Sequence, residues 1–457
     1  MKVQLPVHKQ EKRTGVVADL TYQGNGVIKV DHYPIFLPNA LPGEEVTFVV
    51  TKLTKNFAWG RVLEWHSKSP DRVDLKDQRY LQTGIAPLGH LAYPAQLAFK
   101  RKLIVDLLQK AHLDLPVAET MGMKRPDHYR NKAQVPVKLI RGKLTTGFYK
   151  RGSHDLVPIE DFYIQDPKID QAILAVRNVA RQYRLTPYDE EHHRGDLRTI
   201  MVRRGYYSHQ VMVVLVTRTA KLSHREEIVA AIRERVPELT SLIQNVNGQR
   251  TNKLLGLENH VLWGQATIED QLLGIDFKIS PLSFYQVNPQ QTERLYQTAI
   301  DQAELDGSQT VIDAYCGIGT ISLAVAKHAK QVYGVEIVPE AIADAKQNAE
   351  YNGIENAEFV VGKAEEQMQK WQAVGLKPDV LIVDPPRKGL DESLIEAAGK
   401  MGPQKVIYVS CNPATLVRDL VRFQAAGYRV SKPIQPVDQF PQTTHVESVT
   451  LLDFRGN

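Results

Sequence analysis

Asp313-Ala314-Tyr315-Cys316-Gly317-Ile318-Gly319-Thr320 is the stretch that decides the fold. It begins in the last two residues of the expected strand 310–314 and opens a helix. Glycine lets the backbone approach a ligand closely, and the start of a helix offers free N–H groups. The third glycine of the dinucleotide fingerprint and the lysine of a P-loop are both missing, which disfavours NAD and nucleoside triphosphates. The stretch therefore predicts a strand–turn–helix site for another nucleotide-like cofactor.

Alternating strands and helices surround this turn. We expect a helix over 289–302 and strands over 310–314, 331–336, 357–361, 380–383 and 405–409. This rhythm predicts a doubly wound, mainly parallel sheet, which makes residues 269–457 a Rossmann-like α/β domain. Ligands of such sheets bind at the carboxyl ends of the strands.

Two further domains are expected before it. Residues 1–66 hold five short strands separated by turns, a pattern typical of a small OB-like barrel. Residues 67–268 read as an α+β domain with an antiparallel sheet. An amphipathic helix near 96–111 could pack on the C-terminal domain instead.

Charge is distributed unevenly along the 457 residues. The net charge of +5 divides into +2 for residues 1–66, +11 for 67–268 and −8 for 269–457. Basic side chains of the middle segment alternate with aromatic ones, a mixture suited to phosphate contacts and base stacking. The segment is therefore interpreted as RNA-binding, although solvated helix faces and core aromatics would give a similar composition.

The number of cysteines and the hydropathy of the chain indicate in which cellular compartment the protein is expected. Two cysteines make a disulfide framework unlikely and a four-cysteine metal or iron–sulfur site impossible within one chain. The start lacks the apolar core of a signal peptide, and no apolar run approaches membrane-spanning length. We expect a cytoplasmic protein with no membrane association, and nothing implies an obligate protein partner.

An acid after each of two strands narrows the choice of cofactor. Glu336 ends the strand that follows the glycine turn, where a carboxylate can accept both ribose hydroxyls. Asp384 directly follows the strand 380–383. Together with the turn, these acids favour S-adenosylmethionine over NAD or ATP.

Cys411 lies at the carboxyl end of the apolar strand 405–409 and just before Asn412-Pro413, which stops the strand. A thiolate that adds to carbon 6 of uracil makes carbon 5 nucleophilic enough to take a methyl group from a sulfonium. The alternatives for Cys411 are a buried structural thiol, or that Cys316 in the glycine turn is the reactive cysteine.

Such chemistry also needs a group that holds the pyrimidine and a base that removes the proton from carbon 5. Asp384 is the candidate for holding the N–H edge, with a loop cap before Pro385 as the alternative. Glu447 is the candidate base, with a surface carboxylate as the alternative; His445 either orients it or is structural.

Several motifs in combination resemble the RNA 5-methyluridine methyltransferases. They are Ser283-Phe284-Tyr285-Gln286-Val287-Asn288, Asp313 to Thr320, Asp384-Pro385-Pro386-Arg387-Lys388-Gly389, Val409-Ser410-Cys411-Asn412-Pro413 and Phe440 to Glu447. The first 66 residues are similar to a TRAM domain, so the resemblance covers nearly the whole chain.

The resemblance implies roles for individual residues. Cys411 is expected to be the nucleophile and Glu447 the base. The residues expected to line the cofactor and base pocket are Gln286, Tyr315, Glu336 and Asp384, with Thr320 as a cofactor contact. A TRAM domain favours the ribosomal-RNA branch of the family, because the transfer-RNA branch typically lacks one.

One departure concerns metal. Many ribosomal relatives carry four cysteines for an iron–sulfur cluster just after the TRAM domain, whereas residues 80–91 here contain none. The chain thus resembles the cluster-free members found in Gram-positive bacteria, and no cluster is expected.

The resulting hypothesis is methylation of uracil carbon 5 in 23S ribosomal RNA or its assembly intermediate, at one or more loop uridines. The same reaction on a transfer-RNA T-loop is one alternative. A non-catalytic RNA-binding ribosome assembly factor with a vestigial cofactor fold is the other.

Overall fold

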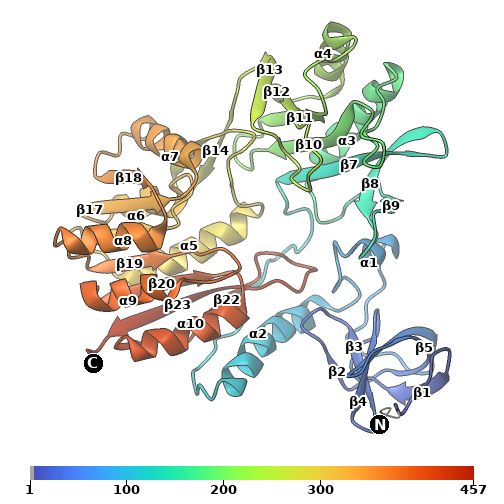
Figure 1. The fold of residues 1–457 in the computed structure, drawn as a ribbon, viewed down its shortest axis with the longest axis horizontal. Coiled ribbons are helices and arrows are strands. Elements are labelled where there is room, and N and C mark those ends of the chain that lie inside the picture. The colour runs from blue at the N-terminus through green and yellow to red at the C-terminus, as the bar shows by residue number, and fades with distance from the viewer. Residues whose placement is uncertain (1–4, 457) are drawn as a thin grey trace.

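The structure is a computed structural model, and it describes residues 5–456. Three bodies follow one another along the chain (Figure 1). A blue N-terminal barrel and a green central sheet lie on one side of the molecule, and a layered orange and red domain lies on the other. The chain boundaries expected after residues 66 and 268 stay predictions.

The N-terminal barrel is a six-stranded sheet. Its strands are β1 (Lys12–Val16), β2 (Asp19–Leu20), β3 (Gly26–Val30), β4 (Tyr33–Leu37), β5 (Glu45–Leu53) and β6 (Ala58–Trp65), in the order β1-β5-β6-β4-β3-β2. Alternate residues of β4 are buried, as a sheet with one face on a core requires. The sequence did not predict β2, because two residues carry no periodicity.

Two helices connect the barrel to the rest: α1 (Arg79–Thr83) and α2 (Tyr93–Lys110). α2 leaves the barrel and packs against α10 (Pro413–Ala425) of the C-terminal domain (Figure 1). Because Ile104 and Leu108 of α2 are buried in a core cluster of that domain, the helix links the barrel to the C-terminal sheet.

The central sheet has seven strands, covered on one face by α3 (Pro167–Gln182) and α4 (Arg225–Arg235). Its strands are β7 (Lys132–Ile140), β8 (Lys143–Tyr149), β9 (Leu156–Pro158), β10 (Leu197–Arg204), β11 (Val211–Thr217), β12 (Leu239–Val246) and β13 (Glu258–Gly264), in the order β13-β12-β11-β10-β7-β8-β9. The prediction of an antiparallel sheet is wrong for one pair of strands, because β11 and β12 run parallel. α4 connects them, and a helical crossover returns the chain in the same direction.

The C-terminal domain begins with a hairpin of β14 (Ile268–Leu272) and β15 (Ile275–Ile279). Its main sheet contains β16 (Thr310–Ala314), β17 (Gln331–Glu336), β18 (Ala357–Val361), β19 (Val380–Val383), β20 (Lys405–Ser410), β21 (Tyr428–Val430), β22 (Gln435–Val437) and β23 (Glu447–Phe454). The order is β18-β17-β16-β19-β20-β23-β21, with β22 also on β23.

Helices cover both faces of this sheet (Figure 1). Besides α10 they are α5 (Pro289–Ala303), α6 (Thr320–Ala326), α7 (Pro339–Tyr351), α8 (Ala364–Ala373) and α9 (Glu392–Met401). Val311 and Ile312, neighbours on β16, belong to two different core clusters, as expected for a strand buried on both faces. The predicted fold class is confirmed.

The parallel part of the sheet runs from β18 to β20, and β23 is antiparallel to β20. The carboxyl ends of the parallel strands and the amino end of β23 therefore meet at one edge. This edge carries the candidate site.

Candidate active site

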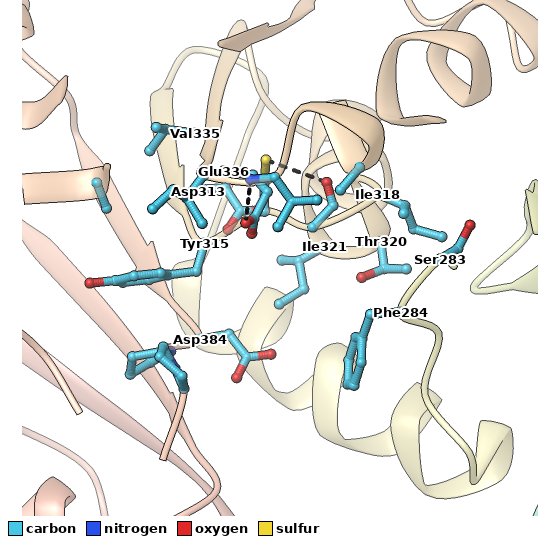
Figure 2. A pocket seen from close by; sticks show the side chains of 18 of the residues that line it. Ser283, Phe284, Asp313, Tyr315, Ile318, Thr320, Ile321, Val335, Glu336 and Asp384 are labelled. Carbon is cyan, nitrogen blue, oxygen red and sulfur yellow. Dashed lines mark hydrogen bonds between the residues drawn. The ribbon is translucent and has the colours of Figure 1, made fainter. Parts of the chain in front are cut away.

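A cavity of about 1100 Å³ opens at this edge. Figure 2 shows its side chains converging from the strand ends and from the loop before α5. All seven predicted site residues line it: Gln286, Tyr315, Thr320, Glu336, Asp384, Cys411 and Glu447. The structure thus brings together residues that are separated by up to 161 positions in the sequence.

The glycine turn forms one wall of the cavity. Tyr315, Gly317 and Gly319 have φ angles of 74°, 55° and 84°, in the left-handed region that favours glycine. A Cβ added at Gly317 would meet no atom within 4 Å, so this stretch of backbone is open toward the cavity. Thr320 begins α6 directly after the turn and points into the cavity (Figure 2).

Asp313 and Glu336 end adjacent strands at the same wall. Oδ2 of Asp313 accepts the Ser322 hydroxyl at 2.5 Å, while its buried Oδ1 has no hydrogen-bond partner among the described residues. Burial raises the pKa of Asp313 to about 7, and the charge of Glu336 adds to the rise. One oxygen of Glu336 accepts the Val338 N–H at 3.0 Å, which leaves the other for a ligand.

Cys411 occupies the turn between β20 and α10. Asn412 caps the helix by accepting the Ala414 N–H at 3.1 Å, and Pro413 is the first helical residue. The Asn412 side chain also donates to the Arg387 carbonyl at 2.9 Å, which ties this turn to the loop after β19. Because the helix start fixes the turn, the half-buried Cys411 side chain is held at the cavity wall.

Burial raises the pKa of the Cys411 thiol to about 12, and the carboxyls of Glu447 and Asp384 add to the rise. Arg387 opposes the shift. Cys411 is therefore a thiol, not a thiolate, when the cavity holds no ligand.

Asp384 follows β19 and points into the middle of the cavity (Figure 2). Burial, followed by the charge of Asp313, raises its pKa to about 7. Asp384 begins a loop that is held in place by the buried Asp419 of α10. The Asp419 carboxylate accepts the Leu390 N–H and the Tyr408 hydroxyl, both at 2.9 Å. Asp384 is therefore held in the cavity rather than capping an exposed loop.

Glu447 is the first residue of β23 and is only 5% exposed. Burial raises its pKa to about 8, the charge of Asp384 adds to the rise, and Arg387 opposes it. The alternative of a surface carboxylate is thus wrong. His445 is exposed, and one of its ring nitrogens lies 3.5 Å from an Arg387 guanidinium nitrogen. It does not contact Glu447 through any hydrogen bond of the described chain.

The loop that leads into Glu447 is fastened to α2 by buried polar contacts. Lys100 forms an ion pair with Asp438, and neither side chain is exposed to solvent. The Tyr93 hydroxyl also donates to Asp438, at 2.8 Å. Gln96 donates to the side chain of Gln442 at 2.8 Å and accepts its backbone N–H at 2.9 Å. No local sequence pattern predicts this network, because a lysine in an amphipathic helix is normally exposed.

The loop before α5 forms the opposite wall and supplies a residue that the sequence analysis did not single out. Phe284 is 68% exposed and faces the cavity across from Asp384 (Figure 2). Gln286, two residues on, donates to the Tyr296 hydroxyl at 3.4 Å. An exposed phenyl ring at the mouth of a polar cavity suits stacking on a planar ligand. The only sequence signal for Phe284 is its position in the motif Ser283 to Asn288.

Comparison with known protein families agrees with this geometry. Residues 92–455 match the model of the tRNA (uracil-5-)-methyltransferase family, and residues 16–63 match the TRAM domain. The chain belongs to this methyltransferase family, which confirms the resemblance drawn from its motifs.

Whole-length relatives carry the same general description. An uncharacterized RNA methyltransferase of Lactiplantibacillus plantarum is 61% identical over 99% of both chains. Another, of Enterococcus faecalis, is 52% identical over 98% of both.

A solved structure is similar over almost the whole chain. It is the Pyrococcus abyssi tRNA (uracil-54, C5)-methyltransferase in complex with S-adenosyl-L-homocysteine. The identity is 27% and the TM-score 0.78, over 96% of this chain and 99% of that one. Because the match covers 96% of this chain, it includes most of the barrel. The Pyrococcus abyssi enzyme therefore contains a counterpart of the barrel. A barrel of this kind therefore does not by itself assign this chain to the ribosomal branch.

Membrane-spanning helices and metal-binding clusters are both absent from residues 5–456. No helix there is both long and apolar enough to cross a bilayer. No group of three or more His, Cys, Asp or Glu side chains in that range is placed to hold a metal ion.

Proposed function

We propose that this protein methylates carbon 5 of uracil in 23S ribosomal RNA through a covalent bond between Cys411 and carbon 6. The observation that carries the proposal is the placement of Cys411, Asp384 and Glu447 around one cavity. A nucleophile, a group that binds the pyrimidine edge and a base are the three parts that the reaction needs.

S-adenosylmethionine is the cofactor, and the cavity wall fits it. The open backbone at Gly317 gives room for close approach, and Glu336 has a carboxylate oxygen free for ribose hydroxyls. Asp313 has a buried oxygen without a partner. Three buried carboxyls also favour a positively charged sulfonium, which supplies the methyl group when bound.

Asp384 orients the uracil ring in this scheme. Its carboxylate accepts the N3–H of uracil, a donor that cytosine lacks in its neutral form. Phe284 stacks on the opposite side of the cavity and holds a uridine that has left its own stack.

Cys411 then forms the bond to carbon 6. Its thiol proton passes to solvent water as the bond forms, and the electrons of the C5=C6 bond move toward O4 and make carbon 5 nucleophilic. The raised pKa keeps the sulfur protonated until the pyrimidine is in place, which protects the free protein from side reactions.

Glu447 completes the reaction. After carbon 5 has received the methyl group, the Glu447 carboxylate takes the remaining proton from that carbon. The electrons of the C–H bond restore the C5=C6 bond and release the Cys411 sulfur. A pKa of about 8 suits this step, because a base is most effective when its pKa lies near the working pH.

The barrel and the basic middle of the chain supply the contacts that hold RNA. The net charge of +11 over residues 67–268 supports a polyanionic substrate. The protein acts in the cytoplasm on 23S ribosomal RNA or its assembly intermediate, at one or more loop uridines. A transfer-RNA T-loop is the second candidate, favoured by the similarity to the Pyrococcus abyssi enzyme.

One assay separates these candidates. Transcribed 23S ribosomal RNA and transfer RNA are each incubated with the protein and methyl-labelled S-adenosylmethionine, and 5-methyluridine is mapped. Label in the ribosomal transcript alone supports the proposal. Label in transfer RNA alone would show that transfer RNA, and not 23S ribosomal RNA, is the substrate. RNA binding without any methyl transfer would instead support a non-catalytic assembly factor.

A further inference from the structure

Two basic residues face each other inside the central sheet. Lys132 of β7 is the direct partner of Arg203 of β10 in the antiparallel pair. The neighbours Ala133 and Val202 point into the core beneath α3 and α4. Since side chains alternate along a strand, Lys132 and Arg203 lie on the other face of the sheet, toward the C-terminal domain.

The described residues leave this pair without an acidic partner. Arg203 is 2% exposed, and its Nη2 donates to the Ser283 carbonyl at 2.9 Å, but its Nε and Nη1 have no hydrogen-bond partner. Lys132 forms no ion pair with any residue in the range 5–456. The carboxyl of Asp270 lies nearby, yet its oxygens accept the backbone N–H groups of Tyr206 and Tyr207, both at 2.9 Å.

The next residue along β10 shows the contrast. Arg204 forms ion pairs with Asp166 at 2.8 Å and Glu238 at 2.9 Å, as a structural arginine normally does. Lys132 and Arg203 instead place like charges directly opposite each other, which destabilises a sheet. Burial, together with Arg203 and Arg130, lowers the pKa of Lys132 to about 7. The pairing itself therefore adds repulsion, although Arg203 alone also holds the Ser283 carbonyl.

The pair lies close behind a wall of the active-site cavity. Arg203 holds the Ser283 carbonyl, and Asn131, next to Lys132, donates its backbone N–H to the Val287 carbonyl at 2.9 Å and its side-chain amide to the Gln286 carbonyl at 3.2 Å. Phe284 and Gln286 of this same loop line the cavity. The two cations therefore lie one loop away from the cavity.

We propose that the Lys132 ammonium, supported by the Arg203 guanidinium behind it, binds a phosphodiester group of the RNA beside the methylated nucleotide. The inference rests on the proposed function and adds the group that positions the strand. An anion bound to Lys132 offsets the repulsion between the two cations, and its hydrogen bond to the ammonium is charge-assisted. The half-buried Lys132 is the member of the pair that RNA can reach.

The test measures binding of transcribed 23S ribosomal RNA to the full-length protein by filter binding over a series of KCl concentrations. Lys132→Gln is expected to weaken binding about tenfold, the effect of losing one charge-assisted hydrogen bond. It should also reduce the slope of log affinity against log salt by about 1. Lys132→Arg should restore both. Lys400→Gln, which removes an exposed charge from α9 in the C-terminal domain, should change neither.

Thermal melting of the same variants separates this role from a structural one. Lys132→Gln should melt at the wild-type temperature or above it, because a repulsive pair is lost. Unchanged affinity and salt slope in Lys132→Gln would overturn the inference, and so would a melting temperature several degrees lower. Failure of the proposed function is seen separately, as absence of methyl transfer by the wild-type protein.

Discussion

Cys411 and Glu447 stand opposite each other at the ends of two adjacent antiparallel strands. The register of β20 and β23 pairs Ser410 with Ser448, and the next position on each strand is Cys411 and Glu447. Both side chains line the same cavity, and the charge of Glu447 contributes to the raised pKa of the Cys411 thiol. A sulfur and a carboxyl placed in this way can act on neighbouring carbons of one ring.

The two cysteines of the chain provide the first prediction. Cys411→Ala should reduce methyl transfer by about 10⁴-fold or more, because no other group can add to carbon 6. Cys316→Ala should keep activity within a few-fold, since Cys316 is buried in an apolar core cluster, where its thiol donates to the Gly317 carbonyl at 3.8 Å. Labelled methyl transfer and RNA binding are measured for both variants. Normal turnover by Cys411→Ala would refute the proposed chemistry.

Glu447→Gln should block the reaction after methyl transfer. The amide keeps the shape of the carboxyl but cannot take the proton from carbon 5, so release of the product should slow by about 10²- to 10⁴-fold. A covalent RNA–protein species should then accumulate and survive denaturing electrophoresis. Glu396→Gln, an exposed position on α9, serves as the control and should form none. If Glu447→Gln forms none either, Glu447 is not the base.

Activity should depend on pH through the same carboxyl. Glu447 must be ionised to accept the proton, and burial raises its pKa to about 8. Because this proton is removed after methyl transfer, kcat should fall about tenfold for each pH unit below that value in the acid limb. Initial rates between pH 6 and 9.5 test this, and a flat profile over that range would contradict it.

Stability should respond to pH in the opposite sense. The pKa of Glu447 is about 8 in the folded protein against 4.5 in the unfolded chain, so the folded state holds the proton more tightly. This contribution is complete below about pH 4.5 and is lost as the pH rises toward 8. The free energy of unfolding of the wild type, relative to Glu447→Gln, should therefore decrease from pH 5 to pH 8. Urea unfolding at several pH values measures it, and an increase would contradict the assignment.

The buried ion pair between α2 and the Glu447 loop should matter for stability. Lys100→Met leaves the Asp438 charge buried without its partner, which should cost about 3–5 kcal/mol of unfolding free energy. Lys102→Met on the same helix removes an exposed pair with Asp106 and should cost about 1 kcal/mol or less. Urea unfolding of both variants checks the difference. Equal losses would mean that Lys100 does not anchor the loop.

Much of the site could be predicted because it lies at the ends of regular strands. The strand before the glycine turn and the strand before Asp384 have the predicted bounds, and β20 extends one residue further. Apolar runs identify such strands, and parallel topology then gathers their ends at one edge. The side chains that this rule places, Asp384 and Cys411 among them, were found from sequence alone.

The remaining features depend on contacts that leave no local pattern. The parallel pair β11–β12 was missed because strand direction is set by the crossover and not by the strand residues. Lys100 was missed because its burial requires Asp438, which lies 338 positions away. The opposition of Lys132 and Arg203 became visible only through the register of β7 and β10.

The central claim is a transient bond between the Cys411 sulfur and the pyrimidine ring, and trapping it is the most direct test. In 5-fluorouridine, carbon 5 carries fluorine in place of the proton that Glu447 removes, so release of the sulfur is blocked. Transcribed 23S ribosomal RNA containing this nucleotide is incubated with the protein and S-adenosylmethionine, and the denatured product is digested and analysed by mass spectrometry. The account predicts a methylated fluorouridine on the peptide that contains Cys411, in the wild type and in Cys316→Ala. Absence of any adduct, or an adduct on Cys316, would contradict it.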